Sequence, residues 1–174
     1  MTDLIQSWIS WDKKASSFIF QHNSSPALNL AMQILTHGGD LLGQLVILPL
    51  FWFWGVPIIP YIVIQLLVQV IIFFLKIFVG RRRPFIQNPN LEHIGQAPWN
   101  MSFPSGHTAA ATITFLYPLF FNLPFPIVFL FFWLMAVVAF TRVYLRVHYL
   151  TDVIAGFLLG IGLFSCWVFF FLIS

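Results

Sequence analysis

The sequence predicts an all-α protein: a polytopic transmembrane helix bundle of about five spans, preceded by N-terminal interfacial amphipathic helices. The first supporting observation is composition. The 174 residues are 60% hydrophobic and only 7% charged, whereas a soluble domain carries about 25% charged residues. The second is the arrangement of apolar residues in long charge-free runs separated by polar breaks. These features argue against a soluble monomer and exclude a disordered chain. Eight Lys and Arg residues are too few for a nucleic-acid-binding stripe.

Residues 3–21 have the pattern of an amphipathic helix. Apolar side chains recur at steps of four and three, at Leu4, Trp8, Trp11, Ala15 and Phe18. Polar side chains follow the same rhythm on the other face, so we expect this helix to lie in the membrane interface. The alternative is a helix that packs on the protein and faces solvent. After a break at residues 22–26, a second short helix is expected to reach about Thr36.

Five apolar stretches follow, each read as a span, although the first is short for the roughly 17–25 residues that a span needs. Their expected limits are about 40–54, 56–79, 105–121, 125–140 and 152–173. Two polar islands separate them, a long one at residues 80–104 and a shorter one at residues 141–151. No repeat or linker divides the chain, which predicts a single integral membrane domain over 1–174. Within it, residues 1–39 form the interfacial helices and residues 40–174 the catalytic transmembrane bundle.

The alternation of five spans places every charged residue on one side of the membrane. The eight Lys and Arg, the five Asp and Glu, and all five histidines fall in the N-terminal region, the two polar islands or the span ends beside them. The chemistry of the protein is therefore expected at one membrane face.

Three polar clusters meet at that face. The first is Lys76 with Arg83-Pro84, the second is Pro104-Ser105-Gly106-His107, and the third is Thr141-Arg142 with His148 and Asp152. Cations at a membrane edge are costly, which marks them as functional candidates. Arginine binds phosphate oxygens in pairs, and the first N–H groups of a helix beginning at Ser105-Gly106 attract anions. Together these groups predict a cradle for a phosphate.

The histidines supply the reactive groups. His148 and Asp152 are four residues apart, so on a helix the carboxylate would fix the imidazole tautomer and leave the other nitrogen as nucleophile or base. With His107 as a second imidazole, one histidine attacks phosphorus and the other protonates the leaving oxygen. The residues alone leave open which one attacks. Each cluster also has a structural explanation: lipid or topology anchors for residues 81–83, a cap neighbour for His107, and an ordinary polar pair for His148 and Asp152.

The three clusters resemble the motifs of the type 2 phosphatidic acid phosphatase (PAP2) superfamily, which includes lipid phosphatases and vanadium haloperoxidases. The family motifs K-x6-R-P, P-S-G-H and S-R-x5-H-x3-D correspond to residues 76–84, 104–107 and 141–152. One position departs from the pattern, because Thr141 stands where the family usually has Ser, although the hydroxyl is kept. The N-terminal region is similar, more weakly, to the interfacial helices of small bacterial members.

This resemblance implies a PAP2-like core and a role for each matched residue. His148 would be the nucleophile, Asp152 its orienting carboxylate, and His107 the general acid and base. The phosphate would be held by Lys76, Arg83, Ser105, Gly106 and Arg142. Arg81 and Arg82 are candidates for contacts to the rest of the headgroup. We expect no metal and no other cofactor, since three cations can hold the transferring group.

We therefore expect a metal-independent lipid-phosphate phosphatase, whose partners are its lipid substrate and the bilayer, without nucleic acid or an obligate protein partner. The resemblance suggests phosphatidylglycerol phosphate, undecaprenyl diphosphate, lipid A 1-phosphate and phosphatidic acid as substrates. The alternatives are a lipid phosphotransferase with the same site, a haloperoxidase, which five apolar spans oppose, and a non-catalytic anionic-lipid-binding protein. The positive-inside rule would place the site in the cytoplasm. Because the phosphate accounts for several of the cations, we follow the family and expect a bacterial inner-membrane protein whose site faces the periplasm or exterior.

Overall fold

The computed structural model describes residues 2–20, 25–88, 90–96, 98 and 101–173, and the regular elements among them are helical. In chain order they are α1 (Thr2–Phe20), α2 (Pro26–Leu35), the 3-10 helix η1 (Thr36–Gly39), α3 (Leu41–Phe53), α4 (Ile58–Val79), α5 (Pro84–Gln87), α6 (Gly106–Phe120), α7 (Phe125–Tyr144) and α8 (Leu150–Ile173). The all-α prediction is confirmed.

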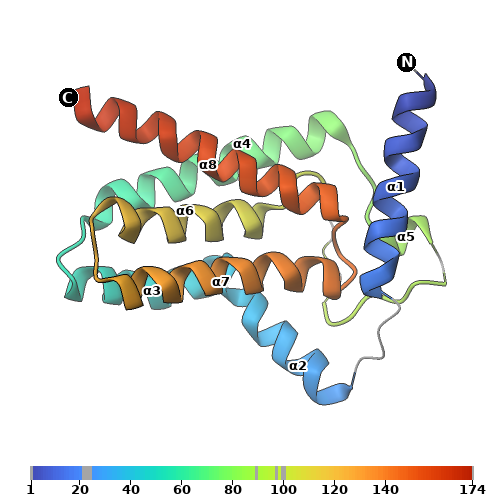
Figure 1. The fold of residues 1–174 in the computed structure, drawn as a ribbon, viewed down its shortest axis with the longest axis horizontal. Coiled ribbons are helices and arrows are strands. Elements are labelled where there is room, and N and C mark those ends of the chain that lie inside the picture. Colours follow the sequence, from blue (N-terminus) through green and yellow to red (C-terminus); the bar gives the residue numbers. More distant parts are fainter. Residues whose placement is uncertain (1, 21–24, 89, 97, 99–100, 174) are drawn as a thin grey trace.

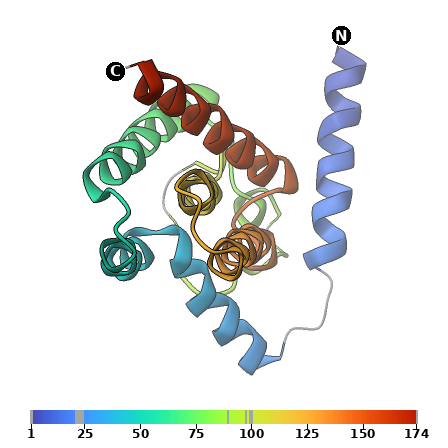
Figure 2. The same ribbon diagram turned by 60° about the vertical axis from the view of Figure 1, so that its left-hand side comes forward.

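The five longer helices after α2 and η1 run along the long axis of the molecule, with α6 at their centre (Figures 1 and 2). α6 packs most extensively on α7 and α8. The contact with α8 is close because small residues face it: a Cβ atom on Gly156 would lie 2.4 Å from the carbonyl oxygen of Ser105, and one on Gly160 would lie 2.8 Å from Cβ of Thr112. Small residues spaced four apart allow this kind of backbone approach between membrane helices.

The five helices expected as spans are present, but not all of them have the length and composition of a full membrane span. Among the described residues, three segments are long and apolar enough to cross a membrane, and a fourth counts if α2–η1 and α3, bent by 61°, form one span. α6 has only 15 residues. Because α6 is enclosed by its neighbours, it does not need the length or the lipid-facing surface of an outer span. Large exposed hydrophobic side chains instead cover α4, α7 and α8.

A buried polar network joins α3, α4 and α6 inside the bundle. Tyr61 donates a hydrogen bond to Gln44 and lies 2.8 Å from the Thr114 hydroxyl. The Gln65 amide donates to the Ala110 carbonyl oxygen and to Thr114, both at 3.1 Å. Hydrogen bonds between membrane helices resist sliding because the surrounding lipid offers no replacement partner. The network therefore helps to fix the position of α6.

α1 runs across the end of the bundle at its edge (Figure 1), and contacts α7 and α8. Among its described side chains, polar ones are buried and aromatic ones are exposed, which is the reverse of the pattern in a soluble protein. Asp12 and Ser16 are buried against the bundle, whereas Trp11 and Phe18 are 51% and 70% exposed. α1 therefore packs on the protein through polar groups and leaves Trp11 and Phe18 exposed beside Lys13 and Lys14, and the interfacial location, in which such aromatic residues would enter lipid, stays a prediction.

Two features of the helices differ from the expectation. The fourth apolar helix does not end near residue 140 but continues as α7 to Tyr144. Thr141 and Arg142 can lie in this helix because their polar groups have partners: the Thr141 hydroxyl donates to the Val138 carbonyl at 2.7 Å, and Arg142 donates to Thr36 at 2.6 Å. The long polar island contains the single-turn helix α5. The expected break at residues 22–26 lies largely outside the described residues.

Candidate active site

The three motifs meet at one end of the bundle. α4 ends there after Lys76, α6 begins there at Gly106, and the connection from α7 to α8 returns there (Figure 1). The Ser105 amide donates to the Asp152 carbonyl at 2.9 Å, which joins the second motif directly to the third. Lys76, Arg83 and Arg142 all act electrostatically on both His107 and His148. The structure thus brings the predicted site residues together.

His148 lies in the connection between α7 and α8 and is only 1% exposed. Its Nε2 is 3.2 Å from Nη1 of Arg83, and its Nδ1 is 3.5 Å from Oδ2 of Asp152, an ion-pair distance without hydrogen-bond geometry. Since a guanidinium can only donate, Nε2 is an acceptor and the ring proton sits on Nδ1, facing the carboxylate. Burial, followed by the charges of Arg142, Arg83 and Lys76, lowers the pKa of His148 well below its usual value. The ring is therefore neutral, with Nε2 as its nucleophilic atom.

Asp152 is fully buried and held at both oxygens. Oδ2 accepts from the Tyr149 amide at 2.9 Å, and Oδ1 accepts from Arg81 at 2.7 Å. The other end of the Arg81 guanidinium pairs with Asp12 of α1 at 2.5 Å, and the group lies 4.1 Å over the Tyr149 ring. The structure does not support the expected headgroup role of Arg81, because the two carboxylates engage its guanidinium. Arg82 is exposed.

α1 also caps the N-terminus of α8. The Leu150 amide donates to the Ser16 hydroxyl at 3.0 Å, and the Thr151 amide donates to Asp12 at 3.1 Å. The first amides of a helix have no partner in their own helix, so these two bonds replace a local cap with side chains from a distant segment. Asp152 lies in the same turn, and α1 therefore supports the orientation of the Asp152 carboxylate.

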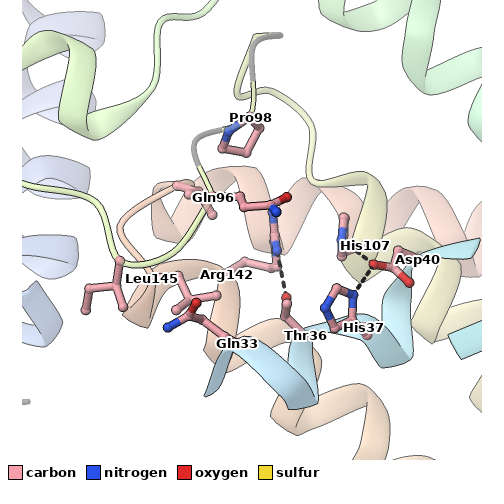
Figure 3. Close-up of a pocket in the computed structure, with 11 residues that line it drawn as sticks. Gln33, Thr36, His37, Asp40, Gln96, Pro98, His107, Arg142 and Leu145 are labelled. Atoms are coloured by element: carbon pink, nitrogen blue, oxygen red, sulfur yellow. Dashed lines mark hydrogen bonds and ion pairs between the residues drawn. The ribbon is translucent and has the colours of Figure 1, made fainter. Parts of the chain in front are cut away.

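A cavity of about 390 Å³ opens beside this cluster, lined in part by His107, Arg142, Val147, Thr36, His37 and Asp40 (Figure 3). Arg142 is buried and donates to Thr36 at 2.6 Å, and its Nε has no hydrogen-bond partner among the described residues. The cavity reaches His107 and Arg142 directly. Arg83, Ser105 and His148 are at most 1% exposed and do not line it, although His148 follows the lining residue Val147 in the chain.

The second motif supplies a helix N-terminus. Ser105 is the N-cap of α6, where its hydroxyl accepts from the Thr108 amide at 3.4 Å. α6 begins at Gly106, and its first backbone bond runs from the Ala109 amide to the Ser105 carbonyl, so the amides of Gly106 and His107 have no acceptor within the helix. Such amides and the positive end of the helix dipole favour an anion, as the sequence predicted for this segment.

Four side chains at the site were missed by reasoning from sequence. Thr36, His37 and Asp40 come from the end of the interfacial region and line the cavity, and Asp12 comes from α1. A signal existed for Asp40 alone, since an aspartate directly before an apolar helix is a typical N-cap. Nothing in the local pattern of Asp12 or Thr36 indicates contact with residues more than 100 positions away.

Comparison with known proteins decides the family. The sequence model of the PAP2 superfamily matches residues 57–173. The chain belongs to the PAP2 superfamily. The crystal structure of a transmembrane PAP2-type phosphatidylglycerolphosphate phosphatase from Bacillus subtilis is similar, with a TM-score of 0.77 and 25% identity over 94% of this chain and 86% of that chain. Aquifex aeolicus LpxE has a TM-score of 0.76 and 23% identity over 89% of this chain and 93% of that chain. No curated protein matches the chain in sequence.

These findings confirm the resemblance noted from the three motifs. The protein is an integral membrane phosphatase of the PAP2 type, and its substrate lies at a lipid bilayer. The match from residue 57 covers all three motifs, whereas α1, α2, η1 and α3 precede it. The side chains that α1 and η1 bring to the site therefore lie outside the matched PAP2 segment.

Proposed function

We propose that this PAP2-type lipid phosphatase removes the terminal phosphate of a membrane lipid through a phosphohistidine on His148. The arrangement of His148 carries the proposal. Its Nε2 accepts from Arg83 while its Nδ1 faces the buried Asp152 carboxylate. A neutral imidazole with one nitrogen oriented by a carboxylate is an activated nucleophile.

The reaction has two halves. In the first, Nε2 of His148 attacks phosphorus and the bond between phosphorus and the lipid oxygen breaks. The electron pair leaves with that oxygen, which takes a proton from His107. In the second half, His107 removes a proton from water as the water oxygen attacks phosphorus. The N–P bond breaks, its electron pair returns to Nε2, and inorganic phosphate leaves, so one water is consumed and both histidines regain their starting states.

Fixed positive charge would stabilise the transferring group. Lys76, Arg83, Arg142 and the N-terminus of α6 surround the two histidines. Preorganised donors aimed at developing charge supply a large part of phosphoryl-transfer catalysis. With these cations in place, we expect the reaction to proceed without a metal ion.

The substrate is proposed as a phosphate monoester or diphosphate on a lipid anchor, since the site lies at the end of a membrane bundle. Phosphatidylglycerol phosphate is the first candidate, because the similar Bacillus subtilis structure is of a phosphatase for that lipid. Undecaprenyl diphosphate, lipid A 1-phosphate and phosphatidic acid complete the panel. A chain of 174 residues leaves little protein for headgroup recognition, which favours broad specificity.

Phosphate release by the purified protein in detergent, with chelator present, tests this proposal. We expect release from at least one lipid of the panel, and a 32P label from that lipid on the protein that is acid-labile, as a phosphohistidine is. His148→Ala should lose both. Release that persists in His148→Ala would contradict the mechanism. A labelled lipid acceptor in place of free phosphate would instead identify a transferase.

We further propose that the protein lies in the bacterial inner membrane with its site facing the periplasm or exterior. Support comes from the partners of the cations, since Arg81 pairs with two aspartates and Arg142 donates to Thr36. A cysteine introduced at Glu92, with the native Cys166 replaced by Ser, should react with a membrane-impermeant maleimide in spheroplasts. Protection until the cells are lysed would place the site in the cytoplasm.

A further inference from the structure

Three titratable side chains meet where η1 adjoins α6. The Asp40 carboxylate oxygen Oδ2 lies 2.6 Å from Nδ1 of His37 and 3.9 Å from Nε2 of His107 (Figure 3). The other oxygen, Oδ1, accepts from the amides of Leu42 and Gly43 at 3.0 and 3.3 Å, which makes Asp40 the N-cap of α3. One carboxylate is thus fixed by a helix end and by an imidazole, with His107 as its next neighbour.

The approach of this segment to His107 is close along the backbone as well. A Cβ atom on Gly39 would lie 2.7 Å from the carbonyl oxygen of His107 and 2.9 Å from its Cβ. Only glycine permits that distance, because a side chain there would push η1 away from α6. The close packing of the η1 backbone against α6 therefore fixes the position of Asp40 relative to His107.

The electrostatic surroundings of His107 give this carboxylate a task. Burial comes first and the charges of Arg142 from α7, His148, Lys76 from α4 and Arg83 follow; each opposes a positive charge on the imidazole, and together they lower the pKa of His107 well below its usual value. From η1 and the start of α3, His37 and Asp40 face it. Asp40 is the carboxylate within 4 Å of the His107 ring among the described residues, and an opposite charge at that distance favours the protonated form.

We propose that Asp40 is a positioning residue: the counter-ion that retains the proton on His107 for transfer to the leaving lipid oxygen, with His37 holding the carboxylate in place. This inference rests on the proposed phosphatase mechanism, in which His107 is the general acid. It assigns a role in catalysis to a segment outside the matched PAP2 residues.

The leaving group provides a selective test. An alkyl oxygen on a lipid needs a proton as it departs, whereas p-nitrophenolate does not, and kcat/KM reports the steps up to phosphohistidine formation. Asp40→Asn keeps an N-cap side chain but removes the charge. We expect its kcat/KM to fall about 10- to 100-fold for the lipid, less than the roughly 10²–10⁴-fold that a complete loss of general acid catalysis would cost, and to fall much less for p-nitrophenyl phosphate. Glu92→Gln, the same charge change at an exposed position, is the control and should match the wild type.

The pH profile gives the second readout. General acid catalysis is lost when the acid loses its proton, so removing the nearby negative charge should move the basic limb of the lipid kcat/KM profile to lower pH. Equal losses for both substrates with an unshifted limb would overturn the proposal and leave Asp40 as a helix cap.

A measurement independent of turnover separates this inference from the proposed function. The imidazole of His107, followed by 15N NMR in labelled protein, should titrate at lower pH in Asp40→Asn than in the wild type or in Glu92→Gln. An unchanged titration would overturn the inference even if the protein is an active phosphatase. If the wild type hydrolyses no lipid, but the titration of His107 is shifted in Asp40→Asn, the result would count against the phosphatase proposal alone.

Discussion

Gly156 is the position where one added methyl group should separate packing from catalysis. Its Cβ atom, if present, would lie 2.4 Å from the Ser105 carbonyl oxygen, whereas ordinary van der Waals contact begins at 3.4 Å. Gly156→Ala must therefore displace the start of α6 by about 1 Å. Ser105 is two residues from His107, so the proposed general acid and the amides proposed to bind phosphate move with it. A displacement of about 1 Å in a catalytic group can cost about 100-fold in rate.

The effect of Gly156→Ala on stability should be smaller than its effect on rate. Overpacking a close contact costs about 1–3 kcal/mol, and alanine recovers up to about 1 kcal/mol of helix propensity over glycine. The net loss in the free energy of unfolding is thus about 0–2 kcal/mol. The variant should remain folded in detergent while its kcat/KM for lipid hydrolysis falls by about two orders of magnitude.

Two other glycines on α8 provide controls for the experiment. A Cβ atom on Gly162 meets nothing within 4 Å, so Gly162→Ala should keep wild-type activity and gain slightly in stability. A Cβ atom on Gly160 meets Thr112 and Ala109, one turn further from the site. Gly160→Ala should therefore lower the stability, but it should reduce activity less than Gly156→Ala does. Phosphate release and thermal unfolding in the same detergent measure both quantities. Wild-type kcat/KM in Gly156→Ala, or equal damage in Gly162→Ala, would refute the reasoning.

Three further predictions follow from the site. Asp12→Ala removes a cap of α8 and a partner of the Arg81 guanidinium. It should lower the free energy of unfolding by about 2–4 kcal/mol, measured by denaturant unfolding in detergent, and it should also lower kcat. Wild-type phosphate release is expected to be unchanged by chelator, and a loss restored by a divalent metal would contradict this. Because the pKa of His148 is lowered in the folded protein, the unfolded chain binds the proton first as pH falls. Stability should therefore be full above pH 6.5, the unperturbed value, and fall below it by up to about 1.4 kcal/mol per pH unit, a slope that His148→Ala should reduce.

The sequence was sufficient for the features whose causes are local. Gly80 ends α4 in a left-handed conformation, and α4 stops at Val79 as the loss of apolar character predicts. The spacing of His148 and Asp152 correctly predicted that they lie close together, although the expected shared helix is absent: α8 begins at Leu150, and His148 reaches Asp152 from the preceding connection. The clustering of the three motifs followed from the one-sided distribution of charge, which requires only that successive helices alternate in direction.

Long-range partners could not be predicted from sequence, because each depends on contacts that no periodicity encodes. The pattern of Arg81 is that of a lipid anchor, yet the guanidinium lies between Asp12 and Asp152. The same limit applies to Arg142 and Thr36. The central place of α6 was also not predicted, since a charge-free run of 15 residues does not reveal whether its helix is enclosed by other helices or faces lipid. The pair Gly156 and Gly160 was a signal for close helix packing that the sequence reasoning left unused.

A series of contacts from α1 to His148, the proposed nucleophile, gives α1 a role that the expected lipid anchoring alone does not explain. Asp12 holds Arg81, Arg81 holds Asp152, and Asp152 faces Nδ1 of His148. Each link is a charged contact with at least one member that is 0–2% exposed, where loss of a partner leaves a poorly solvated charge. The outward side chains of the same helix, Trp11 and Phe18, are those that would enter lipid. The orientation of His148, the proposed nucleophile, is therefore coupled to the docking of α1 on the bundle.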